Sequence, residues 1–576
     1  MLAALLLLAA GAPSSPPWLE GARREVAAVA DVRRAERFAK AGDGTPTHPW
    51  TGWEAAFASV PASGARVLFG PGTYTQTAQV RVPTGLNGWL AVVGGPRVTI
   101  KLTAGAPRFL DPDLTADHQV VRHVWIEGFT IDAGHLGGKD HVIFGNYVDG
   151  GGIGGWRRVD WDAIVIKDVR AFDLLVDPTM SSHRGGVAIL SSQAMPGEAV
   201  ADTITRIYLE GVRIEGGNWG ILVDGGIRTP DGSPNVDIDD VWLVRCWHSL
   251  LERQPRFFSS NFQVGEGARV GHVYVIDCYG QYAADTGLEL NATASAYVSG
   301  TTIEDAAIAN FYYVDYNTPR SEPLVVYERC VSRITGGVHA PYGFGWMIKD
   351  AHRSTLGGGR FRIVDSRFER SGTAQATETG AGVTAEGRLS ELSIARSGFR
   401  LAGVDVGAGP ASQRVLELDF QNDVTFALHD VTVEARGVRS APAGGLSAIT
   451  TQSSAAGKTL TLDWDDVHVS VEVAGPPVDY TIFTSTIYAT AASAVRGTIR
   501  GYRIDRVDGD RHARGINVDL AHQTVAGSLA ISGVDARALP ADGTPVQLNN
   551  VSDPSQARKV SLRRIRKPTA PIGAAP

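Results

Sequence analysis

A six-residue pattern recurs along most of the chain: an apolar residue, any residue, an apolar residue, two further residues, and a small or apolar residue. Apolar residues two positions apart are typical of a half-buried strand, because successive side chains of a strand point to opposite faces. The copies are VWIEGF (124–129), IVIKDV (164–169), IYLEGV (207–212), VWLVRC (241–246), VYVIDC (273–278), TTIEDA (301–306), VVYERC (325–330), FRIVDS (361–366), LSIARS (392–397), FALHDV (426–431), LDWDDV (462–467), IRGYRI (499–504), LAISGV (529–534) and VSLRRI (560–565).

The spacing of these copies predicts the architecture. Their last residues lie 24 to 43 positions apart, which is too uneven for the blades of a propeller. A second pattern, a glycine followed by alternating apolar residues, follows several copies, as in GVAIL (186–190), GILVD (220–224) and GLELN (287–291). Each repeat therefore supplies several short strands that stack on the previous repeat. We predict an all-β fold, a single-stranded parallel β-helix of about 14 coils.

The three cysteines agree with this register. Cys246, Cys278 and Cys330 all occupy the last position of a copy, so stacking places them in equivalent positions. A free cysteine packs as a small apolar side chain, and we predict that all three are buried. The spacings of cysteine and histidine that bind zinc are absent, so the sequence predicts neither a metal site nor a cofactor.

Residues 40–82 contain a Gly-Asp-Gly turn, a short helix predicted over 53–60, and the strand and turn ARVLFGPGTY. This stretch resembles the N-terminal signature of the pectate-lyase-like family, in which a GDGxxDxTxAIQxAI stretch precedes VxxPxGxY. The chain departs from that signature at 48–51, where His-Pro-Trp-Thr replaces the Asp-x-Thr element. The resemblance implies a right-handed β-helix whose N-terminal end is closed by a short capping helix. The resemblance does not imply one reaction, because members of this family resemble glycoside hydrolases, polysaccharide lyases, epimerases and phage tailspikes.

The two ends of the chain differ in composition from the predicted coils. Residues 1–17 begin with an apolar run and continue into Pro and Ser, which predicts a signal peptide and a secreted or periplasmic protein. We predict an N-terminal cap and first strands over 18–85, one β-helix over 86–568, and a flexible tail over 569–576. The apolar run is too short to span a bilayer, so no membrane span is predicted.

Four carboxyl groups lie on or beside the outward positions of the second pattern in the middle coils. A pair of carboxyl groups beside a glycosidic bond can protonate the leaving oxygen and activate water or attack the anomeric carbon. A fully extended strand would hold Asp285 and Glu289 about 13 Å apart. Stacked coils would bring Glu289 and Asp315 to roughly 5–10 Å. The predicted catalytic residues are Asp285, Glu289 and Asp315, with Asp224 in reserve.

The same coils are rich in side chains that suit sugars. Aromatic faces pack on the apolar faces of sugar rings, while amide, imidazole and cationic groups bond hydroxyl or carboxylate groups. The predicted substrate-binding residues are Arg253, Asn291, Tyr312, His339, Tyr342, Trp346, Lys349, Trp247 and His248.

These features predict a secreted carbohydrate-active enzyme that cleaves or transfers glycosidic bonds in a polysaccharide or oligosaccharide. One alternative is a uronate polysaccharide lyase that uses Lys349, Arg253 or His339 as the base. A second alternative is a non-catalytic carbohydrate-binding, tailspike-like or adhesin-like β-helix. The formal net charge of −7 and the lack of a basic stripe predict that nucleic acid is not a partner. Monomer and trimer are both compatible with the sequence.

Overall fold

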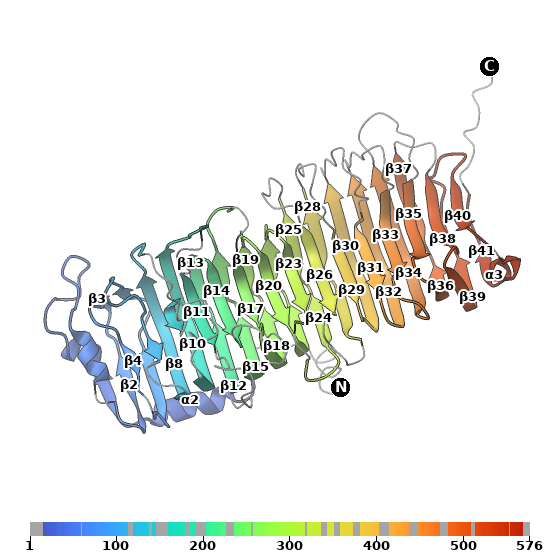
Figure 1. Cartoon of the computed structure of the whole chain (residues 1–576). Helices are drawn as coiled ribbons and strands as arrows, with labels where there is room; N and C mark the ends of the chain where they lie inside the picture. The colour runs from blue at the N-terminus through green and yellow to red at the C-terminus, as the bar shows by residue number, and fades with distance from the viewer. Residues whose placement is uncertain are drawn as a thin grey trace, which may run out of the picture. The chain divides into compact units, whose positions relative to one another are not determined.

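A computed structural model covers the chain (Figure 1). It describes residues 15–58, 60–83, 85–112, 119–136, 141–145, 159–179, 184–190, 203–225, 236–254, 257, 259–316, 319–335, 343–350, 358–371, 381–402, 414–436, 446–472, 482–508, 513–551 and 553–567. These residues form two compact units. Unit 1 comprises Met1–Thr301 with Asp315–Ser321, and unit 2 comprises Thr302–Val314 with Glu322–Pro576.

Unit 1 contains three series of strands, each paired in parallel from coil to coil. The first series is β1 (Val32–Arg34), β2 (Gly64–Leu68), β5 (Trp89–Val93), β8 (Gln119–Asp132), β10 (Val159–Leu174), β12 (Thr203–Glu210), β15 (Val236–Val244), β18 (Ala268–Ile276) and β21 (Thr293–Ser299). The second is β3 (Gly72–Thr75), β6 (Val98–Lys101), the ends of β8 and β10, β13 (Arg213–Gly216), β16 (Trp247–Ser249) and β19 (Tyr279–Gln281). The third is β9 (His141–Gly145), β11 (Gly185–Leu190), β14 (Trp219–Asp224), β17 (Ser260–Val264) and β20 (Thr286–Asn291). Strands β4 (Arg81–Val82) and β7 (Asp111–Pro112) form a separate pair.

Unit 2 repeats the arrangement. Its elements in chain order are β22 (Thr302–Glu304), β23 (Ala309–Val314), β24 (Leu324–Glu328), β25 (Val331–Ile334), β26 (Phe344–Asp350), β27 (Arg360–Val364), β28 (Arg367–Arg370), β29 (Val383–Gly387), β30 (Glu391–Ala402), β31 (Leu416–Phe420), β32 (Val424–Arg436), β33 (Leu446–Ser453), β34 (Thr459–Glu472), β35 (Ile482–Ala489), β36 (Ser493–Arg500), β37 (Arg503–Asp508), β38 (Arg514–Asp519), β39 (Gln523–Ser532), β40 (Thr544–Asn549), α3 (Pro554–Arg558) and β41 (Val560–Arg563).

The predicted parallel β-helix is confirmed. Every strand register that the structure describes is parallel, and β-strands pair with the strand one coil later in the chain. Apolar residues alternate into the interior, so Ile164, Ile207 and Val241 lie directly above one another with no solvent exposure. Coils begin earlier than the first predicted repeat, because β1, β2 and β5 pair in series before β8.

A left-handed residue marks the corner at which each repeat leaves the first series of strands. Glycine and aspartate adopt positive φ at low cost, which explains the frequent Gly and Asp at this position. In unit 1 these residues are Gly128, Asp168, Gly211, Arg245, Asp277 and Gly300; in unit 2 they are Arg329, Asp365, Arg396, Asp430, Asp466, Gly501, Gly533 and Arg564. The next position holds the small or apolar residue that ends the sequence pattern.

Two predicted copies were assigned to the wrong register. In TTIEDA the corner is Gly300, so the true strand is the preceding β21, and β22 begins a different series. In IRGYRI the corner is Gly501, and the strand β36 ends before it. Both errors have one cause: the strand after the corner also alternates, so alternation alone does not locate the turn.

The cysteine prediction is confirmed for burial. Cys246, Cys278 and Cys330 are free and buried. In unit 1, burial raises the pKa of the Cys278 thiol, and the neighbouring Cys246 raises it further. Cys278 is therefore a poor nucleophile. The burial of all three side chains agrees with a role in packing.

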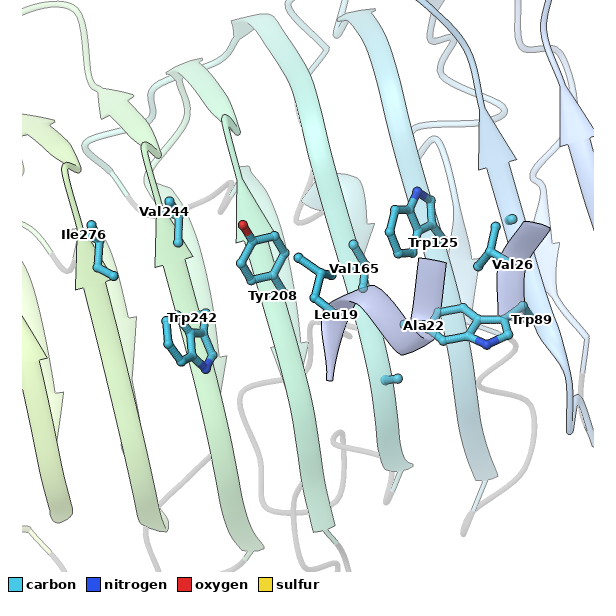
Figure 2. Packing of buried hydrophobic residues seen from close by; sticks show 12 residues of the cluster. Leu19, Ala22, Val26, Trp89, Trp125, Val165, Tyr208, Trp242, Val244 and Ile276 are labelled. Atoms are coloured by element: carbon cyan, nitrogen blue, oxygen red, sulfur yellow. The ribbon is translucent and has the colours of Figure 1, made fainter. Parts of the chain in front are cut away.

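An α-helix that the sequence did not predict, α2 (Leu19–Ala28), lies against the outer side of the first series of strands in unit 1 (Figure 2). Its buried residues Leu19, Ala22 and Val26 form one stripe, as expected for an amphipathic helix. They pack in a cluster that includes Trp125 and Tyr208. This packing explains the helix better than its sequence does, because Gly21 lowers its intrinsic propensity.

The helix predicted over 53–60 is the shorter 3₁₀ helix η2 (Trp53–Phe57); a second 3₁₀ turn, η1 (Ala35–Arg37), precedes it. Trp53 is fully buried and packs edge-on against Phe69 and Tyr74. Its indole donates a hydrogen bond to the carbonyl of Thr75 at 3.1 Å. Phe69 and Tyr74 belong to the ARVLFGPGTY stretch, which therefore supplies the apolar side chains against which η2 packs.

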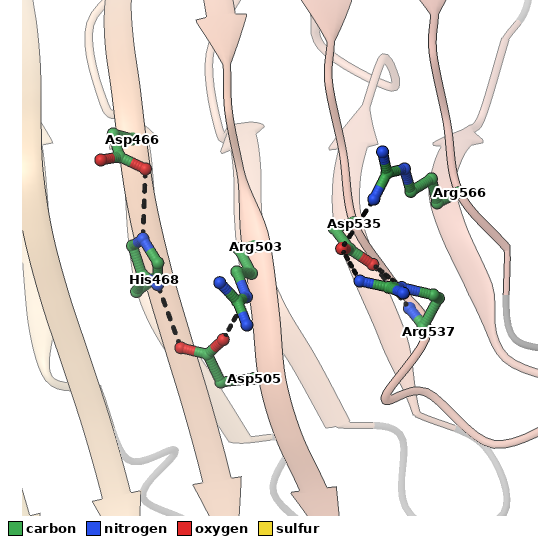
Figure 3. Close-up of polar contacts among 7 residues, drawn as sticks. All are labelled: Asp466, His468, Arg503, Asp505, Asp535, Arg537 and Arg566. Carbon is green, nitrogen blue, oxygen red and sulfur yellow. Dashed lines mark hydrogen bonds and ion pairs between the residues drawn. The ribbon is translucent and has the colours of Figure 1, made fainter.

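Charged side chains link successive coils on the outside of unit 2 (Figure 3). His468 lies between Asp466 and Asp505, with 3.1 Å to each carboxylate. Asp535 accepts two hydrogen bonds from Arg537, at 2.8 and 2.7 Å. Exposed pairs of this kind contribute little each, about 0–1 kcal/mol. In the described part of the chain, no helix is long and apolar enough to cross a membrane.

Candidate functional site

The candidate site lies on the outward face of three neighbouring strands of unit 1, β14, β17 and β20. Parallel registers place Leu222, Gln263 and Glu289 side by side. Their inward neighbours Val223, Val264 and Leu290 are fully buried in the core. The strand alternation that fills the core thus also turns Gln263 and Glu289 outward, and the second sequence pattern predicted this orientation for Glu289.

The start of β20 departs from regular alternation. The hydroxyl of Thr286 donates to Glu289 Oε2 at 2.8 Å, so two residues three positions apart share one face. Thr286 also bonds Ser260 of the neighbouring strand β17 at 2.8 Å. The predicted distance of about 13 Å between Asp285 and Glu289 assumed a fully extended strand. Because β20 begins irregularly, that assumption does not hold. Asp285 is close enough for its charge to raise the pKa of Glu289.

Glu289 is a buried acid. Its side chain is 6% exposed and accepts a hydrogen bond from Asn291 Nδ2 at Oε1, at 2.9 Å, in addition to the bond from Thr286. Burial raises its pKa to about 7, and the charge of Glu266 adds to the effect. The two hydrogen bonds favour the ionised form and oppose this shift. Glu289 therefore exchanges a proton near neutral pH, where an ordinary glutamate is fully ionised.

Gln263 joins two further carboxylates to the site. Its Nε2 donates to Asp224 Oδ2 at 3.1 Å and to Glu266 Oε2 at 2.7 Å. One amide nitrogen therefore holds the two carboxylates beside each other, next to Glu289 in the neighbouring strand. Asp224 and Gln263 are nearly buried, at 4% and 6% exposed, while Glu266 is half-buried. We call Asp224, Gln263, Glu266, Asp285, Glu289 and Asn291 the carboxyl cluster.

The carboxyl cluster contains four residues that the sequence predicted: Asp224, Asp285, Glu289 and Asn291. Asp315 directly follows β23 and its side chain has no solvent exposure. The predicted pairing of Glu289 with Asp315 stays a prediction.

Trp346 and His248, two of the predicted sugar-binding residues, have no exposed surface. Trp346 is fully buried and stacks on Phe311 inside the core, with ring centroids 5.1 Å apart, so its prediction as a sugar platform is wrong. His248 is also fully buried, between the carbonyl of Gly216 and Asn261. Burial lowers its pKa to about 4, so it is a neutral structural residue near pH 7.

Trp247 is partly exposed, and its ring packs against two neighbouring side chains. The guanidinium of Arg213 lies 4.3 Å from the ring centroid. Tyr279 of the next coil stacks on the ring at an interplanar angle of 9°. Both neighbours come from strands that pair with β16, so the three side chains form a stack along the coils. The Trp247 ring therefore packs between side chains of the preceding and the following coil, and its sugar-binding role stays a prediction.

Of the five remaining predicted residues, the structure describes three. Arg253 follows β16, and its guanidinium lies 5.9 Å from the ring centroid of Tyr282. Tyr312 and Lys349 belong to strands β23 and β26 of unit 2. His339 and Tyr342 fall outside the described residues, as do residues 1–14 of the predicted signal peptide and the predicted tail.

Sequence analysis missed Glu266 and Gln263. Glu266 lies in a turn between two glycines of positive φ, Gly265 and Gly267, two residues beyond the end of β17. A Gly-Glu-Gly turn directly after an alternating strand was the available signal, since it returns a carboxylate toward the strand end. Within the described residues, no group of three His, Cys, Asp or Glu side chains is arranged to hold a metal ion.

Comparison with known proteins gives structural similarities only. No family model and no curated protein matches the sequence. The fold is similar to PfbA, a surface adhesin of Streptococcus pneumoniae, with 9% identity, 95% of this chain and 96% of that chain covered, and a TM-score of 0.25. It is also similar to the A-module of the Azotobacter vinelandii mannuronan C-5 epimerase AlgE6, with 12% identity, 90% and 99% covered, and a TM-score of 0.20. The family assignment suggested by the N-terminal signature stays a prediction.

Proposed function

We propose that this protein cleaves or transfers glycosidic bonds in a polysaccharide or oligosaccharide, with Glu289 as the proton donor. The observation that carries the proposal is a buried carboxyl group with a pKa of about 7 beside a half-buried carboxylate, Glu266. A glycosidase needs one carboxyl group protonated and a second ionised at the same pH, which different environments provide.

Five residues of the carboxyl cluster, together with Thr286, have roles in this reaction. Glu289 donates its proton to the oxygen of the leaving sugar. Glu266 supplies the negative charge that attacks the anomeric carbon or activates water. Gln263 orients Glu266 through its 2.7 Å hydrogen bond, and Asn291 and Thr286 orient Glu289. Asp224, on the same amide, keeps the local potential negative and so favours an oxocarbenium-like transition state.

The test is a screen of neutral, amino-sugar and uronate polysaccharides that records reducing ends and ultraviolet absorbance together. We expect new reducing ends without the absorbance of an unsaturated product. Glu289→Gln keeps the shape of the side chain and removes its proton donor, so the rate should fall at least about 100-fold. Glu215→Gln is the matched control, because Glu215 lies on β13 and contacts Arg170 and Arg213 instead of the carboxyl cluster.

Several outcomes would overturn this proposal. A rate unchanged by Glu289→Gln would remove Glu289 from the reaction. An unsaturated product would favour the lyase alternative, in which a base removes a proton beside a uronate carboxylate. Retention of polysaccharides without cleavage of any would favour a binding protein. We further infer export from the apolar run of residues 1–12, and detection of the mature protein outside the cytoplasm would test it.

A further inference from the structure

The last coil of unit 2 ends in an open strand. Strand β41 pairs in parallel with β39, and among the described residues no strand pairs with its other side (Figure 1). Leu562 of β41 lies beside Ile531, which is fully buried, but Leu562 itself is 47% exposed. A position that faces the core in earlier coils is thus accessible here, as expected where a solenoid ends.

The residues of this end are strongly basic. Residues 553–567 contain six cations and one acid, although the whole chain has a formal net charge of −7. All six cations are exposed: Arg558, Lys559, Arg563, Arg564, Arg566 and Lys567. The one acid, Asp553, caps α3 by accepting a hydrogen bond from the backbone of Ser555. The end of unit 2 therefore carries local positive charge within an acidic protein.

The chain does not neutralise most of these cations. Arg566 lies 3.7 Å from Asp535, and Lys559 donates to the carbonyl of Val525 at 3.2 Å. The other four form no ion pair with any described residue: Arg558, Arg563, Arg564 and Lys567. We call these four residues, together with Leu562, the C-terminal basic end.

Earlier coils show which partner these cations lack. Arg500, at the end of β36, lies 3.7 Å from Asp465, its register neighbour in the preceding coil. Two coils later the same register position is Arg563, whose neighbour in the preceding coil is Ser532. Arg563 thus occupies a position at which an earlier coil pairs a cation with an acid. Like charges disfavour the stacking of two such ends on each other, so the complementary partner is one that brings acidic groups.

The chemistry of the end favours one class of acidic partner. Three of its four cations are arginines, whose planar guanidinium binds a carboxylate through two hydrogen bonds. Strand β41 spans four residues and Arg564 turns the chain directly after it at positive φ, so an acidic peptide strand would gain few backbone hydrogen bonds. Residues 553–567 contain no aromatic side chain on which a nucleic acid base could stack.

We propose that the C-terminal basic end binds a polysaccharide that carries carboxylate groups along its length. Arg563 and Arg564 contact carboxylates of the polymer, and Arg558 and Lys567 add to the attraction. Leu562 offers apolar contact to the carbon-bound hydrogens of a sugar between the charged contacts. This binding uses residues of unit 2 alone and is independent of the reaction proposed for Glu289.

The test uses the full chain carrying Glu289→Gln, so that the proposed reaction does not consume the polymer. Biolayer interferometry at low ionic strength measures the Kd for polygalacturonate and alginate, with dextran as the neutral polymer. We expect both uronate polymers to bind, dextran not to bind, and high salt to weaken the binding because it screens exposed charges. Combining Arg563→Gln with Arg564→Gln should raise the Kd for the uronate polymers about tenfold, the effect of losing two exposed ion pairs.

A matched control removes the same charge elsewhere. Arg367→Gln combined with Arg496→Gln changes two exposed residues of β28 and β36, outside the C-terminal basic end, and should leave the Kd unchanged. Thermal unfolding should give Arg563→Gln with Arg564→Gln the melting temperature of the parent, because neither arginine has an ion pair for the substitution to remove.

Four outcomes would overturn the proposal. A lower melting temperature of the Arg563→Gln and Arg564→Gln variant would mean that these arginines are already engaged within the protein. Failure of both uronate polymers to bind would remove the ligand. Equal binding by the parent and this variant, or equal weakening by the control pair, would place the binding elsewhere. Tighter binding of duplex DNA or of anionic phospholipid vesicles than of either uronate polymer would assign the end to another partner. None of these outcomes bears on the Glu289 reaction, which its own variant tests.

Discussion

Replacing Glu289 by glutamine should make the protein more stable at alkaline pH while abolishing its activity. An ordinary glutamate has a pKa of 4.5, and burial beside Glu266 raises that of Glu289 to about 7. Below pH 4.5 the carboxyl group is protonated in both the folded and the unfolded chain and has no effect. Between pH 4.5 and 7 only the unfolded chain releases the proton, so the free energy of unfolding falls as pH rises. The loss reaches about 3 kcal/mol above pH 7.

Glutamine fits the same hydrogen bonds without titrating. Its amide oxygen can accept from Asn291 Nδ2, and its amide nitrogen can donate to the Thr286 hydroxyl, which in turn bonds Ser260. The difference in free energy of unfolding between Glu289→Gln and the parent should therefore grow by about 2–3 kcal/mol between pH 5 and pH 8. The pH comparison cancels any packing effect of the substitution that does not depend on ionisation.

Urea unfolding followed by tryptophan fluorescence at several pH values measures this difference. Glu215→Gln, the same substitution on β13, should shift the free energy of unfolding by an amount that stays constant from pH 5 to pH 8. If Glu289→Gln and the parent changed in parallel with pH, burial would not be controlling this carboxyl group. The proton donor proposed for the reaction would then lack its physical basis.

Three further predictions concern the coils. Leu19→Asp buries a charge beneath α2 and should destabilise unit 1 by about 3 kcal/mol, with faster proteolysis near residue 28 as the readout. Gly345→Ala should lower the free energy of unfolding by about 1–3 kcal/mol, because the new Cβ would lie 2.5 Å from a carbonyl oxygen and from a phenylalanine ring. Gly398→Ala is the control and should leave the free energy of unfolding unchanged, because no atom lies within 4 Å of the new Cβ. Asp365 accepts two hydrogen bonds from Arg396, which hold the pKa of Asp365 below its usual value. Above pH 4 this pair should contribute less than about 1 kcal/mol to the free energy of unfolding. Urea unfolding should show that the contribution disappears at lower pH or in high salt.

The fold was predictable because its rules are local. Alternation within one strand and a small residue at one position recur in every coil, and Cys246 and Cys278 followed from that register alone. The corner residues explain the two register errors, since the left-handed conformation at Gly300 and Gly501 is not visible as alternation. Helix α2 escaped prediction because its stability comes from packing on residues more than sixty positions away, such as Trp89.

The candidate site was only partly predictable. Outward parity identified Glu289, Asn291 and Asp224, because it depends on the same alternation as the core. Glu266 was missed because a turn, and not a strand, carries it to the site. Trp346 occupies the inward apolar position of GWMIK, where it is fully buried and stacks on Phe311. Its aromatic character suggested a sugar-binding role, but alternation alone places its side chain in the core.

Glu289 differs physically from the other outward residues of the coils. Outward charges such as Asp365 and Arg396 are partly exposed and paired, which is what solubility and coil stacking require. Glu289 is instead 6% exposed, and its raised pKa lowers the stability of the folded protein wherever the carboxyl group is ionised. Glutamine would fill the same space without that loss. A residue without which a fold would be more stable is the expected mark of a site that acts on a ligand.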